Sequence, residues 1–342
     1  MLAVHCHPTL RSLRSRLPQV LAVAAALAFA ACDGSQSPLA PADEALAPTT
    51  EAAPSEAVAS DNLTLITSQR IAFTSLRNGT SAPDVYKMDP EGLHVLRLTS
   101  LGEIDAGTAW SYDNKHIVLP RRRLGPSNGY MRDLYVIDAD GSNGHWVRAT
   151  PFPYALNDPS WSPDGSRIVL SVSLNHTRYL GWMDVATGQV NLFNAVSGGQ
   201  LGEHPSYDPT GQKIIYVGIA GKTVEQINAD GSGHTTRFSS ATLLRDPTFS
   251  PDGKKIAFAR TVGTGNNDEI FVKNLVDGSV KRLTTSAAID IQPTWSPDGS
   301  KIAFARRLAG GAFQIYTMSA NGGTPMRITH TSTDESSPSW SH

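Results

Sequence analysis

Short apolar runs recur along the chain, and polar, turn-forming residues separate them. Each run contains isoleucine beside other aliphatic or aromatic residues and follows directly after a Pro-Asp-Gly or Pro-Thr-Gly segment. Such runs are typical of strands buried between packed sheets, because β-branched and aromatic side chains fit a pleated surface. The clearest runs lie at residues 167–170, 213–216, 255–258 and 301–304.

The segment before each run repeats a signature of proline, a small polar residue and an aromatic residue, followed in three copies by Ser-Pro-Asp-Gly. Proline sets φ at the second position of a turn, aspartate accepts backbone N–H groups, and glycine takes the left-handed position. A strand that carries the aromatic residue therefore ends at a tight reversal, and the apolar run forms the next strand. Complete and partial copies place the aromatic residue 42 to 51 residues apart, at Trp110, Trp161, Tyr207, Phe249, Trp295 and Trp340.

Most repeats continue with two further strand patterns. A β-prone segment predicts a third strand and is followed by an Asp-Gly or Asn-Gly turn in several copies. An Arg-Leu-Thr or Arg-Ile-Thr triplet then predicts a fourth strand. Four antiparallel strands in a unit of this length form one blade of a β-propeller. The third strands are expected at residues 84–89, 133–138, 269–274 and 314–319, and the triplets that close the fourth strands lie at residues 97–99, 282–284 and 327–329.

The repeats together predict an all-β fold, a six-bladed β-propeller of four-stranded antiparallel blades over residues 63–342. The N-terminal copy begins at its second strand, at Ile71, and the C-terminal copy stops after a first strand that contains Trp340. We therefore expect the C-terminal strand to pair with the N-terminal blade, which closes the ring and removes exposed sheet edges. Residues 63–66 compete for the same place but lack the proline–aromatic signature.

The beginning of the chain predicts a secretory signal. Three arginines precede an apolar stretch at residues 20–31, with no acidic residue before Asp33. A basic segment followed by a short apolar stretch and small residues is typical of a signal peptide, and twelve residues are too few for the roughly 20 of a membrane-spanning helix. We expect residues 1–31 to be this signal peptide.

Cys32 follows directly after small residues, which resembles a bacterial lipobox. We expect the Cys32 thiol to carry lipid and to anchor the chain to a membrane. The alternative is an ordinary signal peptide cut near Ala31, although Phe29 departs from the leucine that a lipobox usually has. Residues 32–62, which are rich in Ala, Pro, Ser and Glu, predict a disordered tether between the anchor and the propeller.

Composition and cysteine content argue against a nucleic-acid-binding protein, a disulfide-linked fold and a thiolate metal site. The chain has 29 Lys and Arg against 31 Asp and Glu, a formal net charge of −2 at pH 7, so no nucleic-acid partner is indicated. Its only cysteines, Cys6 and Cys32, leave the expected propeller without a disulfide or a thiolate metal site. The sequence also contains no convincing cofactor-binding motif, so we expect no metal and no cofactor.

The repeated motifs resemble those of the TolB-type β-propeller family. The resemblance rests on Trp-Ser-Pro-Asp-Gly, Lys-Ile-Ala-Phe and Ile-Tyr-Thr-Met-Ser-Ala-Asn-Gly-Gly in this order, and it covers residues 63–342. It implies an extracytoplasmic propeller of a bacterial cell envelope that acts as a binding module. The N-terminal α/β domain of TolB has no counterpart between Cys32 and the first blade, so the TolA-binding arm is not carried over. No Gly-x-Ser-x-Gly hydrolase elbow occurs.

Polar residues gather where the innermost strands of a propeller would begin. The residues three positions before the aromatic residues form a ring at one mouth of the expected channel. Three interpretations of this ring remain open: a solvent-filled funnel, a site for a peptide, protein or sugar, and a metal-assisted active site. The candidate binding residues in the ring or beside it are Asp158, Glu203, His204, Arg245, Asp246, Asp290 and Gln292.

We therefore predict a non-catalytic binding module or scaffold that recognises a protein or peptide partner, or a glycan, and that is monomeric on its own. The alternative is an enzyme, a lyase or hydrolase, that uses Asp158, Glu203, His204 and Asp246 at the channel mouth. Convergence of these carboxylates with His204 in a pocket, and a raised pKa of one carboxylate, would favour the enzyme.

One further feature is a basic run, Arg121–Arg123, which we expect in a loop between the second and third strands of the second blade. It is either a solvated rim or a patch for an anionic partner.

Overall fold

The computed structural model describes residues 69–342 except 102–103, 105–106, 125–129, 149–154, 194–200, 264 and 266. The expected signal peptide, Cys32, the tether and the competing strand at residues 63–66 lie outside the described residues. None of the described residues forms a helix long and apolar enough to span a membrane.

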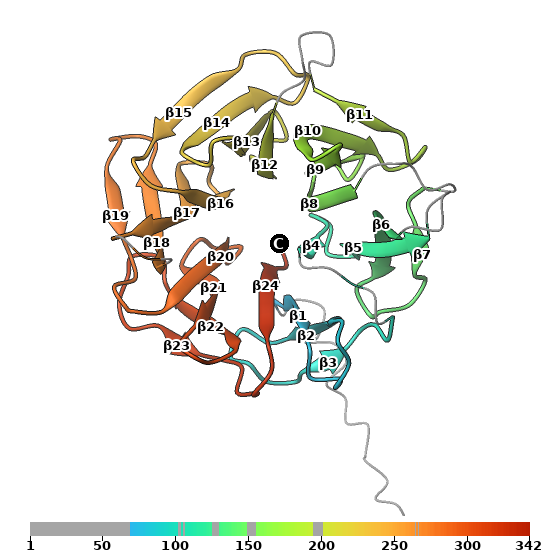
Figure 1. Cartoon of the computed structure of the whole chain (residues 1–342), viewed down its shortest axis with the longest axis horizontal. Helices are drawn as coiled ribbons and strands as arrows, with labels where there is room; N and C mark the ends of the chain where they lie inside the picture. Colours follow the sequence, from blue (N-terminus) through green and yellow to red (C-terminus); the bar gives the residue numbers. More distant parts are fainter. Residues whose placement is uncertain are drawn as a thin grey trace, which may run out of the picture. The chain divides into compact units, whose positions relative to one another are not determined.

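Six sheets of four antiparallel strands surround a central channel (Figure 1). We number them as blades I to VI and give their strands from the channel outward. Blade I contains β24 (Glu335–Trp340), β1 (Ile71–Ser75), β2 (Asp84–Met88) and β3 (Leu96–Arg97). Blade II contains β4 (Ala109–Trp110), β5 (His116–Leu124), β6 (Tyr130–Asp138) and β7 (His145–Trp146). Blade III contains β8 (Ala155–Trp161), β9 (Arg167–Leu174), β10 (Thr177–Asp184) and β11 (Val190–Leu192).

The other three blades repeat this order. Blade IV contains β12 (Gly202–Tyr207), β13 (Lys213–Gly218), β14 (Thr223–Asn228) and β15 (Thr235–Ser239). Blade V contains β16 (Leu244–Phe249), β17 (Lys255–Val262), β18 (Asn267–Asn274) and β19 (Val280–Arg282). Blade VI contains β20 (Ile289–Trp295), β21 (Lys301–Arg307), β22 (Phe313–Ser319) and β23 (Met326–Arg327). The predicted all-β, six-bladed propeller is confirmed.

The ring closes in blade I, where the two ends of the described chain share one sheet. Strand β24 pairs with β1 in antiparallel register, with Ile71 opposite Trp340. Just beyond the strand pair, the Ser341 N–H donates to the Arg70 carbonyl oxygen at 2.8 Å, and the Arg70 N–H donates to Ser341 Oγ at 2.8 Å. The predicted closure by the C-terminal strand is therefore confirmed.

The Ser-Pro-Asp-Gly segments form the predicted reversals between the first and second strands. In blade III the Ser162 hydroxyl donates to Asp164 Oδ1 at 2.6 Å, and the Gly165 N–H donates to the Ser162 carbonyl oxygen at 2.9 Å. Gly165 has φ +72°, which favours glycine. Blades V and VI repeat these bonds, so the signature ends the inner strand at the same point in each of the three.

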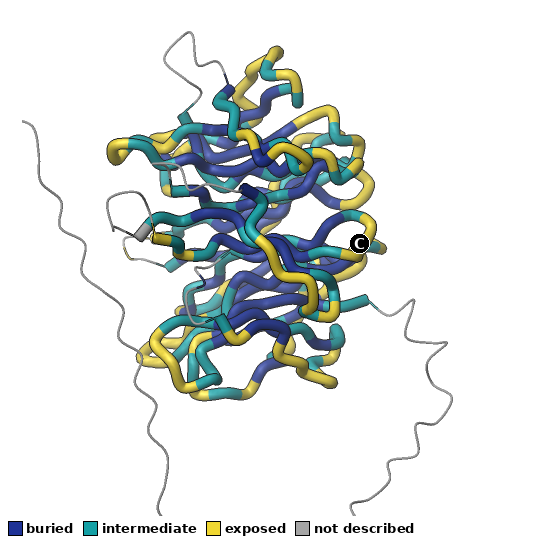
Figure 2. The backbone as a smooth tube through the Cα atoms, turned by 90° about the vertical axis from the view of Figure 1, so that its right-hand side faces the viewer, coloured by how far each residue is buried: buried dark blue, intermediate teal, exposed yellow. Residues whose placement is uncertain are grey.

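Apolar side chains fill the wedges between neighbouring sheets. Figure 2 shows buried residues running along the strands and exposed residues at the turns. The repeated aromatic residue joins adjacent blades, since the Trp161 indole N–H donates to the Ala109 carbonyl oxygen of blade II at 3.2 Å. The Trp295 indole N–H makes the equivalent bond to the Thr248 carbonyl oxygen of blade V at 3.3 Å.

The basic run does not lie in a loop, and that prediction is wrong. Arg121–Arg123 belong to β5, which continues to Leu124 and pairs with β6 over nine residues. The side chain of Arg121 lies over the rings of Tyr135 and Trp146, at 5.0 and 5.2 Å from their centroids. Aromatic side chains on β6 and β7 give Arg121 and Arg123 a packing surface, so the strand continues through the basic run.

Candidate functional site

The residues three positions before the repeated aromatic residue share an unusual backbone. All six have positive φ, between +49° and +108°, although only one of them is glycine. In five blades the pairing of the innermost strand shifts register at this point, which marks a β-bulge. A non-glycine residue in this conformation costs about 1 kcal/mol or more, so other interactions must hold it. The six residues, called the channel ring below, are Gly107, Asp158, His204, Asp246, Gln292 and Ser337.

Hydrogen bonds between blades offset the free-energy cost of the positive φ angles in the channel ring. The Gln292 N–H donates to Asp246 Oδ2 at 3.0 Å, and the Ser337 N–H donates to Gln292 Oε1 at 2.8 Å. The Gly107 N–H in turn donates to Ser337 Oγ at 3.1 Å. Each of these side chains therefore binds the backbone of the next ring residue, which joins blades that are far apart in sequence.

His204 brings the acidic part of the channel ring together. Its Nδ1 lies 2.6 Å from Asp246 Oδ1 and 3.9 Å from Asp158 Oδ1, and its side chain is 23% exposed. Burial opposes the charged imidazole, but the two carboxylates outweigh it and raise the pKa of His204 to about 9. Burial also disfavours the Asp246 carboxylate, yet His204 and the Gln292 N–H hold the pKa of Asp246 below its ordinary value. At neutral pH the site is an imidazolium between two carboxylates.

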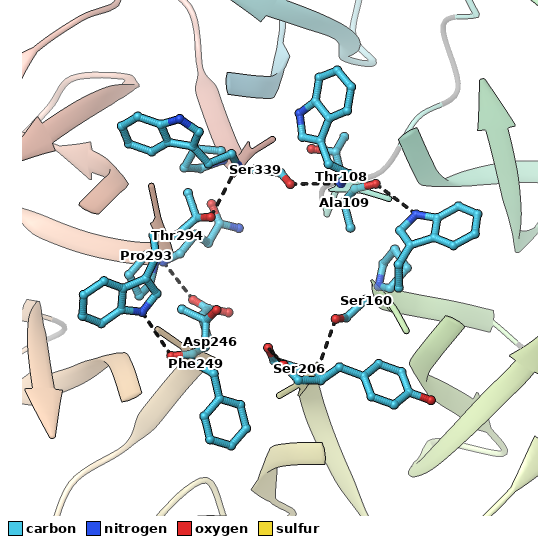
Figure 3. A pocket seen from close by; sticks show the side chains of 18 of the residues that line it. Thr108, Ala109, Ser160, Ser206, Asp246, Phe249, Pro293, Thr294 and Ser339 are labelled. Carbon is cyan, nitrogen blue, oxygen red and sulfur yellow. Dashed lines mark hydrogen bonds between the residues drawn. The ribbon is translucent and has the colours of Figure 1, made fainter. Parts of the chain in front are cut away.

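The channel ring opens into a cavity of about 420 Å³ along the propeller axis. Figure 3 shows side chains from all six blades around this cavity, with inter-blade hydrogen bonds between neighbours. The cavity also includes residues two positions after the aromatic residues, at the Ser-Pro-Asp-Gly end of the channel. There Tyr112 and His342 stack with ring centroids 3.8 Å apart, beside Pro209, Pro251 and Pro297. One end of the channel is therefore polar and the other is aromatic and apolar.

Four of the seven candidate residues line this cavity: Asp158, His204, Asp246 and Gln292. The other three are not among its lining residues. Each of them is held instead in an ion pair beside the ring.

Ion pairs occupy Glu203, Arg245 and Asp290. Glu203 binds Arg178 of blade III, and Arg245 Nε lies 3.4 Å from Asp268 Oδ2. Asp290 is fully buried and accepts two hydrogen bonds of 2.7 Å from the Arg306 guanidinium. Glu203 and Arg245 are next to a ring residue in sequence, and strand residues alternate in direction, so they point elsewhere. Asp290 is two positions before Gln292 and is held by Arg306 on the neighbouring strand β21.

Sequence analysis missed the aromatic end of the cavity and the role of Ser337. Tyr112 and His342 occupy the position that proline holds in the other repeats, so the same offset counted after the aromatic residue would have found them. Ser337 is the ring position of blade I, and its Oγ also accepts a hydrogen bond from Gln292 Nε2 at 3.2 Å.

The described residues contain no group of three or more His, Cys, Asp or Glu side chains that could hold a metal ion. In particular, His204 faces its two carboxylates through a single nitrogen, Nδ1.

Solved structures with similar folds include the crystal structure of TolB from Acinetobacter baumannii, with a TM-score of 0.67 and 22% identity over 79% of this chain and 66% of that chain. An oligogalacturonate lyase in complex with manganese has a TM-score of 0.51 and 16% identity over 76% of this chain and 74% of that chain. At these identities the likeness concerns the fold alone.

Sequence comparison gives a closer relation. The Tol-Pal system protein TolB of Francisella tularensis subsp. holarctica is 26% identical over 210 residues, which is 47% of this chain and 47% of that protein. The chain thus spans about half the length of the curated relatives it matches. A profile of the TolB beta propeller domain matches residues 67–242 and 233–342. Because these matches extend over nearly all described residues, the chain belongs to the TolB beta propeller domain family.

Proposed function

We propose that this protein is an extracytoplasmic binding module of a bacterial cell envelope, which holds a peptide segment of a protein partner in its central channel. The observation that carries the proposal is the cavity of about 420 Å³ with a charged, asymmetric ring at one end and an aromatic, proline-lined wall at the other. The ring contains five residue types at its six positions, which suits an irregular ligand rather than a symmetric one. Relatives named for the Tol-Pal system support a protein partner.

The binding experiment replaces ring side chains while keeping the backbone. Asparagine tolerates positive φ, so Asp158→Asn with Gln292→Asn should leave the propeller folded. We expect a partner captured from solubilised envelopes by the wild-type chain to be retained about tenfold less by this double variant, because the charge and hydrogen bonds that orient the segment are lost. The control is Asp277→Asn, an exposed turn carboxylate in blade V, which should capture as the wild type does. Equal capture by all three would contradict the channel as the binding site.

Anchoring is a separate part of the proposal. A lipid on Cys32 and the tether of residues 32–62 would hold the propeller near a membrane. In a detergent phase-separation experiment on protein made in a bacterial host, the wild type and Cys6→Ser should enter the detergent phase. Cys32→Ser should stay in the aqueous phase, because the thiol that carries the lipid is gone. If the wild type also stays in the aqueous phase, the chain has no lipid anchor.

One observation supports the enzyme as a second candidate function. Asp158 and Asp246 do converge on His204 in the cavity, as a catalytic arrangement would require. However, the pKa of Asp246 is lowered, whereas a carboxyl group that donates a proton to a leaving group needs a raised pKa. The lowered pKa argues against Asp246 as the proton donor of a hydrolase, and the asymmetric cavity makes binding the better-supported function. Incubation with oligogalacturonates tests the alternative, and formation of unsaturated products that stops in Asp246→Asn would favour the enzyme.

A further inference from the structure

A second cavity, of about 510 Å³, lies between blades II and III, which are neighbours in the ring (Figure 1). Blade II contributes His116, Val136 and His145 to its lining, and blade III contributes Trp161 and Val185. Two lining residues are shared with the central cavity, but none belongs to the channel ring. The groove, as we call this second cavity, is therefore separate from the polar end of the channel.

Blade II carries a short side chain at a repeat position that borders the groove. His116 begins the second strand of blade II, and the other blades have arginine or lysine at the equivalent position. In blade I this residue, Arg70, forms an ion pair with Asp89 at 3.2 Å. In blade III the Arg167 guanidinium lies 4.0 Å from the centroid of the Trp182 ring. An imidazole is shorter than either basic side chain, so His116 fills less of the space beside its blade. The equivalent basic residues are Arg70, Arg167, Lys213, Lys255 and Lys301.

A second cation found in the preceding pair of blades is also missing from the groove. In blade I, Lys87 of β2 reaches across to blade II, where its Nζ donates to the Ala139 carbonyl oxygen at 2.8 Å. Val136 holds the place of Lys87 in blade II, because both residues pair with the second residue of the apolar run. Val185 holds the place of Ala139 in blade III, because both N–H groups donate to the carbonyl oxygen just before a second strand. The groove thus contains the equivalent of the acceptor residue without the lysine that binds it one blade earlier.

Negative charge surrounds the groove. Its described lining residues include two carboxylates, Asp113 and Asp164, and no lysine or arginine. A third carboxylate, Asp138 at the end of β6, lies with Oδ1 3.5 Å from His116 Nε2. Lys115 offsets part of this charge, since its Nζ lies 3.6 Å from Asp113 Oδ2, but its side chain is 75% exposed. A cation that enters the groove would therefore meet more carboxylate charge than the nearby lysine neutralises.

The remaining lining residues suit the aliphatic stem of a basic side chain, because methylene groups pack against apolar surface while the charged end stays among polar groups. These apolar residues are Val136, Val147, Val185 and Ala186. We propose that the groove binds a lysine or arginine side chain of a partner protein, with the stem against these residues and the cation among Asp113, Asp138 and Asp164. The partner's side chain then fills the place that Lys87 fills between blades I and II.

This site goes beyond the proposed function, because the groove lies outside the channel ring and needs no ligand in the channel. The two shared residues, Tyr112 and Trp161, lie where the aromatic end of the channel meets the groove. A partner segment at that end of the channel can therefore place a basic side chain in the groove as well.

Titration of the full chain with short peptides, followed by proton NMR, tests the groove. The probe is acetyl-Gly-Gly-Lys-Gly-Gly-amide, and the signals are the imidazole C2 protons of His116 and His145, assigned with His116→Gln and His145→Gln. We expect both signals to shift in a saturable manner. The same peptide with norleucine in place of lysine keeps the stem but lacks the charge, and it should bind about tenfold more weakly.

Two variants remove the site while keeping the fold. In Asp113→Asn with Asp138→Asn, the lysine peptide should bind about tenfold more weakly, because the cation loses two charged partners. Asparagine suits position 138, since Asn228 and Asn274 end the third strands of blades IV and V. Asp230→Asn with Asp277→Asn, at exposed turns of those blades, is the matched control and should bind as the wild type does.

The second variant fills the groove from within. His116→Arg restores the basic residue that the other blades have, so its guanidinium should occupy the carboxylates and lower peptide binding about tenfold, as measured by the His145 signal. Lys213→Arg, the equivalent position of blade IV, should leave binding unchanged.

Three results would overturn the proposal. The first is the absence of a shift with the lysine peptide, or equal affinity for the norleucine peptide. The second is tighter binding of spermidine than of the lysine peptide, which would make the groove a site for a free polyamine. The third is a loss of peptide binding in the channel variant Asp158→Asn with Gln292→Asn, which would place the peptide in the channel. Peptide binding in the groove together with equal partner capture by that channel variant contradicts only the proposed channel function and supports the groove.

Discussion

Deleting residues 335–342 is expected to abolish cooperative folding of the propeller. The deletion removes β24, the innermost strand of blade I, and leaves the completely buried strand β1 without its partner on the channel side. It also removes Glu335, which accepts hydrogen bonds from Ser75 at 3.0 Å and from Arg77 at 2.8 Å. An unpaired apolar edge pairs readily with other chains, so the shortened protein should aggregate.

Thermal unfolding followed by circular dichroism, together with light scattering, measures this effect. Trp340→Ala offers a milder test of the same strand, because the indole is only 2% exposed, and it should lower the free energy of unfolding by about 3–5 kcal/mol. Trp295→Ala at the equivalent position of blade VI should cost a similar amount. Leu308→Ala, at an exposed position, should stay within about 0.5 kcal/mol of the wild type. A deleted chain that unfolds at the wild-type temperature would show that β24 does not close the ring.

Stability should also fall as the pH rises from neutral to alkaline, through His204. Its pKa is about 9 in the folded protein and 6.5 ordinarily, so the folded state binds the proton more tightly. The resulting stabilisation is fully present below pH 6.5 and is lost as the pH rises through 9. The difference corresponds to a contribution on the order of 3 kcal/mol.

Urea unfolding between pH 6 and pH 9 measures this contribution. In His204→Gln the decline over this range should largely disappear, and glutamine suits the backbone because Gln292 holds the same conformation at the equivalent position, with φ +56°. His145→Gln, at an exposed position, should keep the wild-type profile. A wild-type profile that is flat from pH 6 to pH 9 would mean that Asp158 and Asp246 do not stabilise the charged imidazole.

Local chemistry explains why so much of the architecture was predictable. A propeller blade is built from short-range signals: a Ser-Pro-Asp-Gly reversal such as residues 162–165, an apolar run after it, and a turn before the outer strand. Each signal depends on neighbouring residues only, and its repetition gives the number of blades. Even the closure of the ring followed from counting strands. The N-terminal blade lacked an innermost strand, and the C-terminal strand was an innermost strand without a blade of its own.

The polar end of the channel was only partly predictable for the opposite reason. The repeat offset places Asp158, His204, Asp246 and Gln292 around the same cavity, because equivalent positions occupy equivalent places around an axis. It could not separate them from Glu203, Arg245 and Asp290, whose directions depend on a β-bulge and on partner arginines from other strands.

The amino-acid sequence by itself determined the strands, their order, the six blades and the closure, because turns and apolar periodicity act between residues close in the chain. Only the tertiary structure decided which polar side chains meet. His204 and Asp246 lie 42 residues apart in sequence and 2.6 Å apart in space. Their contact, and the charge it stabilises, exists because rigid blades bring strained backbone positions to one axis, and no local pattern encodes that distance.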